Sequence, residues 1–288
     1  NTLIVDEGDP FNEILFNKSI NILKSKNFFS KVETKLKPST SPNFKIVDIN
    51  VEEKPTGEIS LGAGFGSTGG NFGGGIKENN FLGKGIMLDT SFVITAESIK
   101  GSFTYARPNF NYTDNTLFTS LSSTSTDNIK NFGYKTNRTA FSLGSKFEQF
   151  ENFYFSPELS SSYEDLETTS TASSILKEQT GDYLDIYLNY SLDYDMRDQR
   201  YQTKSGFRSV FYQELPLNSK LGEVINSYTF TKYKSLFSSD MIGKIGITGK
   251  AVNTIRNEHV RVSKRLYIPY NKLRGFVYGS LGPVENGD

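Results

Sequence analysis

The sequence predicts a mainly β protein: a transmembrane antiparallel β-barrel of about eleven strands, preceded by a small α+β module. Three observations predict this fold. Apolar and polar residues alternate over segments long enough to cross a bilayer. The 288 residues include 23 Phe, 16 Tyr and 25 Gly, yet only 36% of them are hydrophobic. No apolar run approaches the ~20 residues of a membrane helix.

Residues 1–56 carry the one convincing helix. Asn12 is a suitable N-cap, Glu13 favours the first turn, and an apolar face follows at helical spacing. That face contains Phe16, Ser19, Ile20 and Leu23. Two strands are expected over Lys31–Lys37 and Phe44–Glu52, joined by a turn at 38–42. This module is too small to be stable alone, so it needs a further element or a neighbour.

From Glu58 onward the sequence period is two. Leu184, Ile186, Leu188 and Leu192 fall on one face of a strand, and Asp185 and Asp193 fall on the other. Such alternation is typical of a barrel strand with lipid outside and a polar lumen inside. The predicted strands are 58–67, 70–79, 85–96, 98–107, 115–127, 132–147, 153–166, 182–194, 205–215, 226–238 and 241–252.

The connections between these segments favour a barrel over a soluble β-sandwich. Tight turns, such as 82–84 and 238–240, contrast with a long polar connection over Glu164–Gly181. Short turns on the periplasmic side and long loops outside are the outer-membrane pattern. Several segments run for ten residues or more, which is long for sandwich strands.

Composition argues against several other functions. The 32 basic and 32 acidic residues cancel, so no basic excess indicates nucleic-acid binding. With no cysteine and one histidine, His259, a zinc site or a Ser-His triad has almost no support. The glycines at 62–66 and 73–75 precede no helix, so they are not a phosphate loop. We therefore expect no cofactor, no metal and no enzymatic activity.

Several motifs, in order along the chain, resemble the BamA family of outer-membrane assembly barrels. Residues 8–12, Phe28-Phe29 with Val32, and residues 47–51 and 53–57 look like that family's last polypeptide-transport-associated (POTRA) domain and its junction with the barrel. Asn79–Gly85 resembles the first periplasmic turn. Asp195–Asp198, Tyr201 and Lys204–Gly206 resemble a D-x-R-D…Y…T-x-x-G stretch, with Gln202 in place of the usual Pro. Arg274-Gly275-Phe276, with Gly282-Pro283, resembles the arginine motif of loop six.

The resemblance implies a partial POTRA domain at 1–56 and an outer-membrane barrel at 57–288. The family barrel has sixteen strands, so about eleven of sixteen strands would be present and the chain would be a fragment. Arg274 would enter the lumen and meet acidic wall residues in later strands. The implied location is the bacterial outer membrane, with residues 1–56 in the periplasm.

The implied function is the assembly and insertion of β-barrel proteins at a lateral gate. The gate strand would be the first one, which contains Glu58, Ile59, Ser60, Leu61, Gly62, Ala63, Gly64, Phe65 and Gly66. Partners would be unfolded outer-membrane proteins, accessory outer-membrane lipoproteins, periplasmic chaperones and the lipid bilayer. Alternatives are a two-partner secretion transporter, a translocation-and-assembly module barrel, or a passive porin, although a porin would not carry a helix and a hairpin directly before its first strand.

Overall fold

The computed structural model describes residues 3–5, 7–25, 28–39, 45–66, 69–199, 203–237, 241–256 and 258–268. The chain divides into two compact units, one of residues 1–60 with 76–88 and one of residues 61–75 with 89–288. No described helix is long and apolar enough to span a membrane.

The first unit contains the predicted helix, α1 (Glu13–Ser25). The Asn12 side chain accepts hydrogen bonds from the backbone N–H groups of Ile14 and Leu15, at 2.9 and 3.2 Å, which confirms the N-cap. Phe16, Ser19 and Ile20 are buried, as the spacing predicted. Strands β1 (Phe29–Pro38) and β2 (Lys45–Glu53) form an antiparallel hairpin. The predicted turn at 38–42 lies partly outside the described residues.

A hydrogen-bond network in the same unit explains the Asn79–Gly85 motif. The Thr56 hydroxyl donates to the Glu78 carboxylate, and that carboxylate also accepts from the Asn80 N–H at 2.7 Å. The Asn80 side chain then accepts from the Gly85 N–H at 2.7 Å. The motif therefore closes a tight turn and fixes it to the segment that follows β2.

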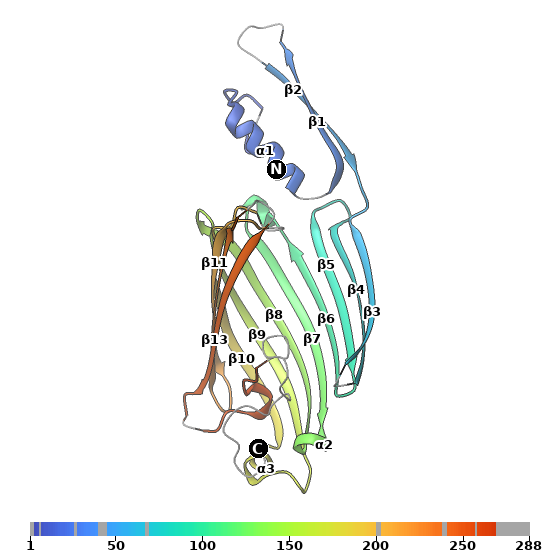
Figure 1. Ribbon diagram of the computed structural model, residues 1–288, viewed down its shortest axis with the longest axis vertical. Helices are drawn as coiled ribbons and strands as arrows, with labels where there is room; N and C mark the ends of the chain where they lie inside the picture. Colours follow the sequence, from blue (N-terminus) through green and yellow to red (C-terminus); the bar gives the residue numbers. More distant parts are fainter. Residues whose placement is uncertain are drawn as a thin grey trace. The chain divides into compact units, whose positions relative to one another are not determined.

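All eleven predicted barrel segments are strands (Figure 1). They are β3 (Gly57–Gly66), β4 (Gly69–Phe81), β5 (Ile86–Thr95), β6 (Ser98–Arg107), β7 (Thr116–Asn128), β8 (Tyr134–Phe150), β9 (Phe153–Thr168), β10 (Gly181–Asp195), β11 (Gly206–Asn218), β12 (Glu223–Ser235) and β13 (Ile242–Thr254). Within the described residues they form one eleven-stranded sheet in sequence order, with β3 and β13 at its edges. Each pair of consecutive strands from β6 to β13 is antiparallel. The sheet is therefore an open meander, as expected of part of a barrel.

The connections give the sheet two distinct ends. At one end, which we call the turn end, residues 151–152, 196–205 and 236–241 join successive strands. At the other, the loop end, lie short helices α2 (Ile129–Phe132), α3 (Ser174–Glu178) and η2 (Val262–Lys264). The long connection predicted from Glu164 begins later, because β9 continues to Thr168. That part of the prediction was wrong: Glu164 and Leu166 keep the alternation and are buried.

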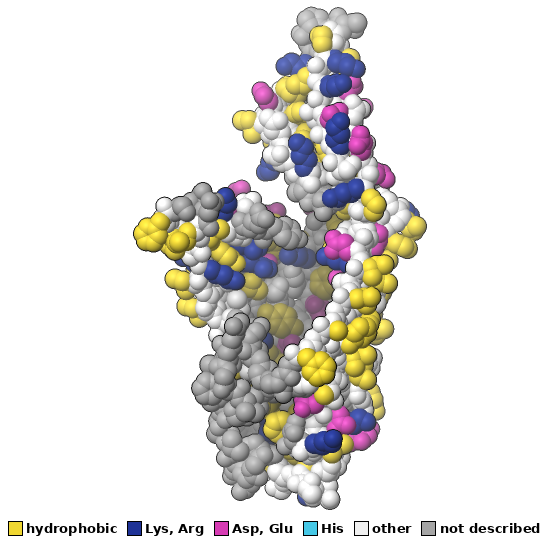
Figure 2. Space-filling view, turned by 45° about the vertical axis from the view of Figure 1, so that its right-hand side comes forward, with side chains coloured by type: hydrophobic (Ala, Val, Ile, Leu, Met, Phe, Trp, Pro, Cys, Tyr) yellow, Lys and Arg dark blue, Asp and Glu magenta, His cyan; other side chains and the backbone are white. Residues whose placement is uncertain are grey.

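The strands have two chemically different faces, as β10 shows. Tyr183, Asp185, Tyr187 and Asn189 are buried on one face, which we call the inner face. Leu184 and Leu188, on the outer face, are 59% and 39% exposed. The outer face is therefore apolar and uncovered, which suits contact with lipid. Figure 2 shows hydrophobic side chains gathered in patches on the surface of the strands.

Candidate functional site

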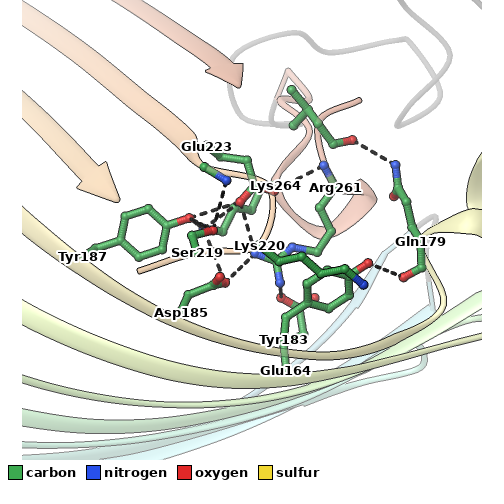
Figure 3. A network of polar contacts seen from close by, with 12 residues as sticks. Glu164, Gln179, Tyr183, Asp185, Tyr187, Ser219, Lys220, Glu223, Arg261 and Lys264 are labelled. Atoms are coloured by element: carbon green, nitrogen blue, oxygen red, sulfur yellow. Dashed lines mark hydrogen bonds and ion pairs between the residues drawn. The ribbon is translucent and has the colours of Figure 1, made fainter. Parts of the chain in front are cut away.

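The candidate site is a buried ionic cluster on the inner face of the sheet (Figure 3). Arg261 enters it from the segment that follows β13, and its side chain is completely buried. One terminal nitrogen, Nη2, donates to Asp185 Oδ2 at 2.5 Å and to Glu223 Oε2 at 3.2 Å. The other, Nη1, lies 3.3 Å from Glu164 Oε2. One guanidinium thus meets three carboxylates.

Three different strands supply these carboxylates. Glu164 comes from β9, Asp185 from β10 and Glu223 from the first position of β12. In antiparallel pairing, directly opposed residues share a face. Tyr183 is opposite Glu164 and Asp185 is opposite Ser162, so strand register brings both acids to the inner face. Arg261 therefore links the loop after β13 to strands that are distant in sequence.

Lys264 adds a second cation to the cluster. Its ammonium donates to the Tyr187 hydroxyl at 2.5 Å and lies 3.6 Å from Glu223 Oε2. The Tyr187 hydroxyl in turn donates to Glu223 Oε2 at 3.1 Å. Burial lowers the pKa of Lys264, and the nearby Glu223 carboxylate offsets part of that effect.

The pKa of Arg261 moves in the other direction. Burial alone lowers it, but the carboxylates of Glu164, Glu223 and Asp185 outweigh burial, so the pKa lies above its usual value. The guanidinium also lies over the Tyr183 ring, 4.2 Å from its centroid. Arg261 is therefore charged at any physiological pH.

Neutral contacts hold the same segment beside the cluster. The Val262 N–H donates to Gln179 Oε1 at 2.9 Å, and Gln179 Nε2 donates to the Val260 carbonyl at 3.3 Å. Val262 is buried in an apolar cluster of Tyr134, Leu166, Ala172, Leu176 and Tyr183. Apolar burial, backbone hydrogen bonds and ion pairs thus fix residues 260–264 against the inner face.

A second ionic group lies on the inner face near the turn end. Arg208 makes a two-pronged contact with Asp193, through Nε at 2.8 Å and Nη2 at 2.7 Å. Arg197 makes the same kind of contact with Asp195, at 2.7 Å for each bond. The first and third residues of the D-x-R-D stretch are therefore an ion pair.

Both clusters consist of ion pairs and hydrogen bonds between side chains of the inner face. A buried pair contributes little net stability, but removal of one partner leaves an uncompensated charge. The described residues contain no group of three or more His, Cys, Asp or Glu side chains that could hold a metal ion. His259 is exposed in the segment after β13. The arrangement can position a loop inside a barrel wall.

One family model matches most of the sequence. The model of the Omp85 superfamily domain matches residues 80–288, which is more than half of the sequence. The chain belongs to the Omp85 superfamily. Barrels of this superfamily sit in the bacterial outer membrane, in agreement with the apolar outer face. A search of curated protein sequences gives no match.

Solved structures have the same fold. The structure of BamA from Haemophilus ducreyi lacking POTRA domains 1–3 matches with a TM-score of 0.78 and 20% identity, over 98% of this chain and 57% of that one. CdiB from Acinetobacter baumannii matches with 0.58 and 13%, over 96% and 53%. CdiB from Escherichia coli matches with 0.55 and 12%, over 96% and 54%. This Omp85 chain thus spans little more than half the length of the chains that it matches.

The sequence-predicted site residues have different outcomes. Arg274, Gly275 and Phe276 lie outside the described residues, so the arginine motif stays a prediction. Residues Glu58–Gly66 lie within β3, at an edge of the sheet, and their role as a gate also stays a prediction. Asp185 and Asp193 are buried on the inner face, where the alternation predicted them.

Sequence reasoning missed Arg261, Lys264 and Glu223. Arg261 lies in a segment without periodicity, and nothing in its neighbours distinguishes it from a solvated loop arginine. Glu223 was missed because the predicted strand began at 226, whereas β12 begins at Glu223. The usable signal was the glycine at position 222, because glycine often ends a turn with a positive φ, and Gly222 has a φ of 65°. A strand that starts directly after this glycine includes Glu223.

Proposed function

We propose that the chain is part of an outer-membrane assembly factor that folds and inserts other β-barrel proteins by strand addition at a lateral gate. The process would involve no bond chemistry, no ATP and no metal. The observation that carries the proposal is the composition of β3, the first strand of the sheet, which has four glycines in ten residues. A strand that separates from its neighbour presents unpaired N–H and C=O groups, which template the addition of another strand.

The composition of β3 supports a gate at this strand. Ile59, Leu61 and Phe65 are 78%, 73% and 95% exposed, so lipid would contact them in the membrane. A Cβ placed on Gly62 would meet nothing within 4 Å. Glycine also increases the flexibility of a strand and removes packing. These properties favour an edge that opens more readily than the rest of the wall.

The inner-face clusters support the complementary role of a rigid wall. Arg261 joins strands β9, β10 and β12 through one buried guanidinium. Arg208 and Asp193 join β10 to β11. In this proposal the wall from β9 to β12 stays fixed while β3 separates from its neighbour in the complete barrel. An incoming strand then pairs with β3, and its release restores the original closure.

The proposal includes the domain division, the orientation and the partners. Residues 1–56 would be a partial POTRA domain in the periplasm, residues 57–288 would belong to the barrel, and the turn end would face the periplasm. Clients would be unfolded outer-membrane proteins delivered by periplasmic chaperones, with accessory outer-membrane lipoproteins as further partners. We propose no nucleic-acid partner, because the net charge is zero.

A two-partner secretion transporter is the second candidate. The likeness to both CdiB structures favours it, since each TM-score exceeds 0.5. The two candidates differ in what crosses the barrel: a client strand leaves sideways through the gate, or a secreted chain passes through the lumen. A passive porin fits less well, because a helix and a hairpin precede the first strand.

The test is a disulfide lock in the full-length protein. These 288 residues contain no cysteine, so an engineered pair adds the only cross-link within them. One cysteine replaces Ser60 in β3, and the other replaces its neighbour in the last barrel strand. The readout is the yield of folded client barrel in proteoliposomes, oxidised against reduced. We expect the oxidised protein to lose client folding and the reduced protein to regain it.

The matched control locks two strands away from the gate. Ser123 in β7 is opposite Thr139 in β8, with the hydroxyl oxygens 3.4 Å apart. Cysteines at these two positions should cross-link without a loss of client folding. Full client folding by the protein locked at Ser60 would exclude the gate. Two results together would favour the secretion transporter. No variant would fold a client barrel, and the protein would export a secreted chain only when the Arg261 loop does not block the lumen.

A further inference from the structure

A continuous row of aromatic rings follows the turn end of the sheet on its outer face. It passes across five strands through Phe150, Phe153, Tyr194, Phe207 and Phe230. Successive ring centroids are 6.2, 6.3, 5.6 and 5.8 Å apart. Tyr194 alternates with Asp193, which is buried on the inner face, so the row lies on the outer face. Aromatic rings in this position occupy the membrane–water interface.

Two lysines lie beside this row, both on β12. Lys232 is opposite Phe207 on one side and Ile245 on the other, and Ile245 is 69% exposed. Lys232 therefore shares the outer face with the rings. Lys234 lies two residues farther toward the turn end and shares that face. Both lysines are exposed, and within the described residues neither forms an ion pair.

The chemistry changes in order along this face. Along β12, Phe230 comes first, and Lys232 and Lys234 follow toward the turn end. An aromatic side chain is thus followed by basic ones, as the interface is followed by the headgroups in a bilayer leaflet. On the outer face of β11, β12 and β13, the described residues include no Asp or Glu. Within the part of these three strands that the structure describes, no carboxylate on the outer face offsets this positive charge.

We propose that Lys232 and Lys234, with Phe207 and Phe230, form a docking site for the phosphate of an anionic phospholipid. The lipid would belong to the leaflet at the turn end, and this orientation rests on the proposed function. The two ammonium groups receive the phosphate, and the rings flank its glycerol and upper acyl region. Lipid is the occupant because the lysines continue an apolar surface that faces hydrocarbon. A protein partner would instead need acidic groups that reach this depth.

Among the strands that carry the row of rings, a pair of outer-face lysines near the turn end occurs on β12. The outer-face positions of β9 and β10 carry the same rings but no lysine or arginine near the turn end. A general attraction of the barrel for anionic lipid would involve many strands and would not depend on these two lysines. The inference therefore predicts that two specific lysines decide how much anionic lipid remains bound to the purified protein.

The test uses native mass spectrometry of the full-length protein in detergent, titrated with phosphatidylglycerol or with phosphatidylcholine. We expect Lys232→Gln with Lys234→Gln to weaken phosphatidylglycerol retention by about fivefold per lysine removed. Phosphatidylcholine retention should stay unchanged. Lys232→Arg with Lys234→Arg should keep the wild-type retention, because either cation can bind a phosphate.

Lys84→Gln with Lys177→Gln is the matched control, since both lysines are exposed and the charge change is equal. Heat-dependent gel mobility shows that each variant is a folded barrel. Unchanged phosphatidylglycerol retention in the β12 variant, or an equal loss in the control, would overturn the site. Loss of a co-purifying accessory protein with lipid retention intact would also overturn it. Client folding is measured separately, so failure of the proposed function leaves the lipid result readable.

Discussion

The Arg261 guanidinium lies 2.5 Å from the Asp185 carboxylate, although the two residues are 76 positions apart in the chain. The contact brings the segment after β13 back across β12 and β11 to β10. Lys264 and Val262 reinforce it with a hydrogen bond to Tyr187 and with apolar burial. The position of this loop is therefore set by interactions on the inner face of the wall.

Removal of the Arg261 charge should release this loop. Arg261→Ala leaves Glu164, Asp185 and Glu223 without their main cation, at a cost of about 3–5 kcal/mol. Arg261→Lys should recover only part of this lost stability, because one ammonium cannot span three carboxylates. The measurement is protease cleavage within residues 255–268 of the full-length protein. Arg256→Ala is the control, since Arg256 is exposed and donates a hydrogen bond to the Lys220 carbonyl, away from the buried cluster. Equal cleavage of all variants would contradict the prediction.

Most strands of the wall could be predicted from the sequence, but the loop that packs against their inner face could not. Lipid outside and a polar lumen inside impose alternation, so Leu184 and Asp185 could be assigned to opposite faces from the period alone. The helix could be predicted because Asn12 caps it and Phe16 and Ile20 share a face. These features depend on neighbours within a few residues.

The Arg261 cluster depends on the path of a loop, which no local pattern encodes. The path is fixed by contacts such as Val262 to Gln179, more than eighty positions away in the chain. The three acids are separated in sequence and meet only because strand register places them on one face. The start predicted for β12 was also too late, at residue 226, so Glu223 fell outside the predicted strand.

Gly206 should be irreplaceable in the connection between β10 and β11. Its φ is 98°, and a Cβ there would lie 2.1 Å from the Met196 carbonyl oxygen. Gly206→Ala should cost at least about 1–3 kcal/mol from backbone strain, with the steric clash in addition. The temperature at which the barrel loses its folded gel mobility should fall. Gly249→Ala is the control, because nothing lies within 4 Å of that position. An unchanged temperature for Gly206→Ala would show that the turn can rearrange.

The same connection should loosen in acid. Burial tends to raise the pKa of Asp198, but backbone N–H donors of Ser205, Lys204 and Gln199 outweigh it and lower the pKa. A lowered carboxyl pKa gives stability that is present above the unfolded value, ~3.9. It is lost as the pH falls through the lower folded value. Pepsin cleavage within 196–205 should therefore rise below about pH 4.

Asp198→Asn should reduce that pH dependence, because the amide oxygen still accepts hydrogen bonds but does not titrate in this range. Asp114→Asn, in the connection between β6 and β7, is the control for a general effect of charge. If wild type and Asp198→Asn show the same rise in cleavage, another group controls the acid response.

Arg274 provides the remaining prediction, which rests on the resemblance of Arg274-Gly275-Phe276 to a loop-six motif. If Arg274 enters the lumen, Arg274→Ala should leave an acidic partner uncompensated and cost about 3–5 kcal/mol locally. Arg274→Lys should rescue only partly, since a point charge cannot replace a two-pronged contact. The readouts are protease sensitivity of residues 269–288 and the yield of folded client. Arg261 already holds residues 260–264 in place, so cleavage at 255–264 should stay low in Arg274→Ala and rise in Arg261→Ala. If Arg274→Ala changes neither cleavage nor client yield, Arg261 alone fixes the loop and Arg274 has no mechanistic role.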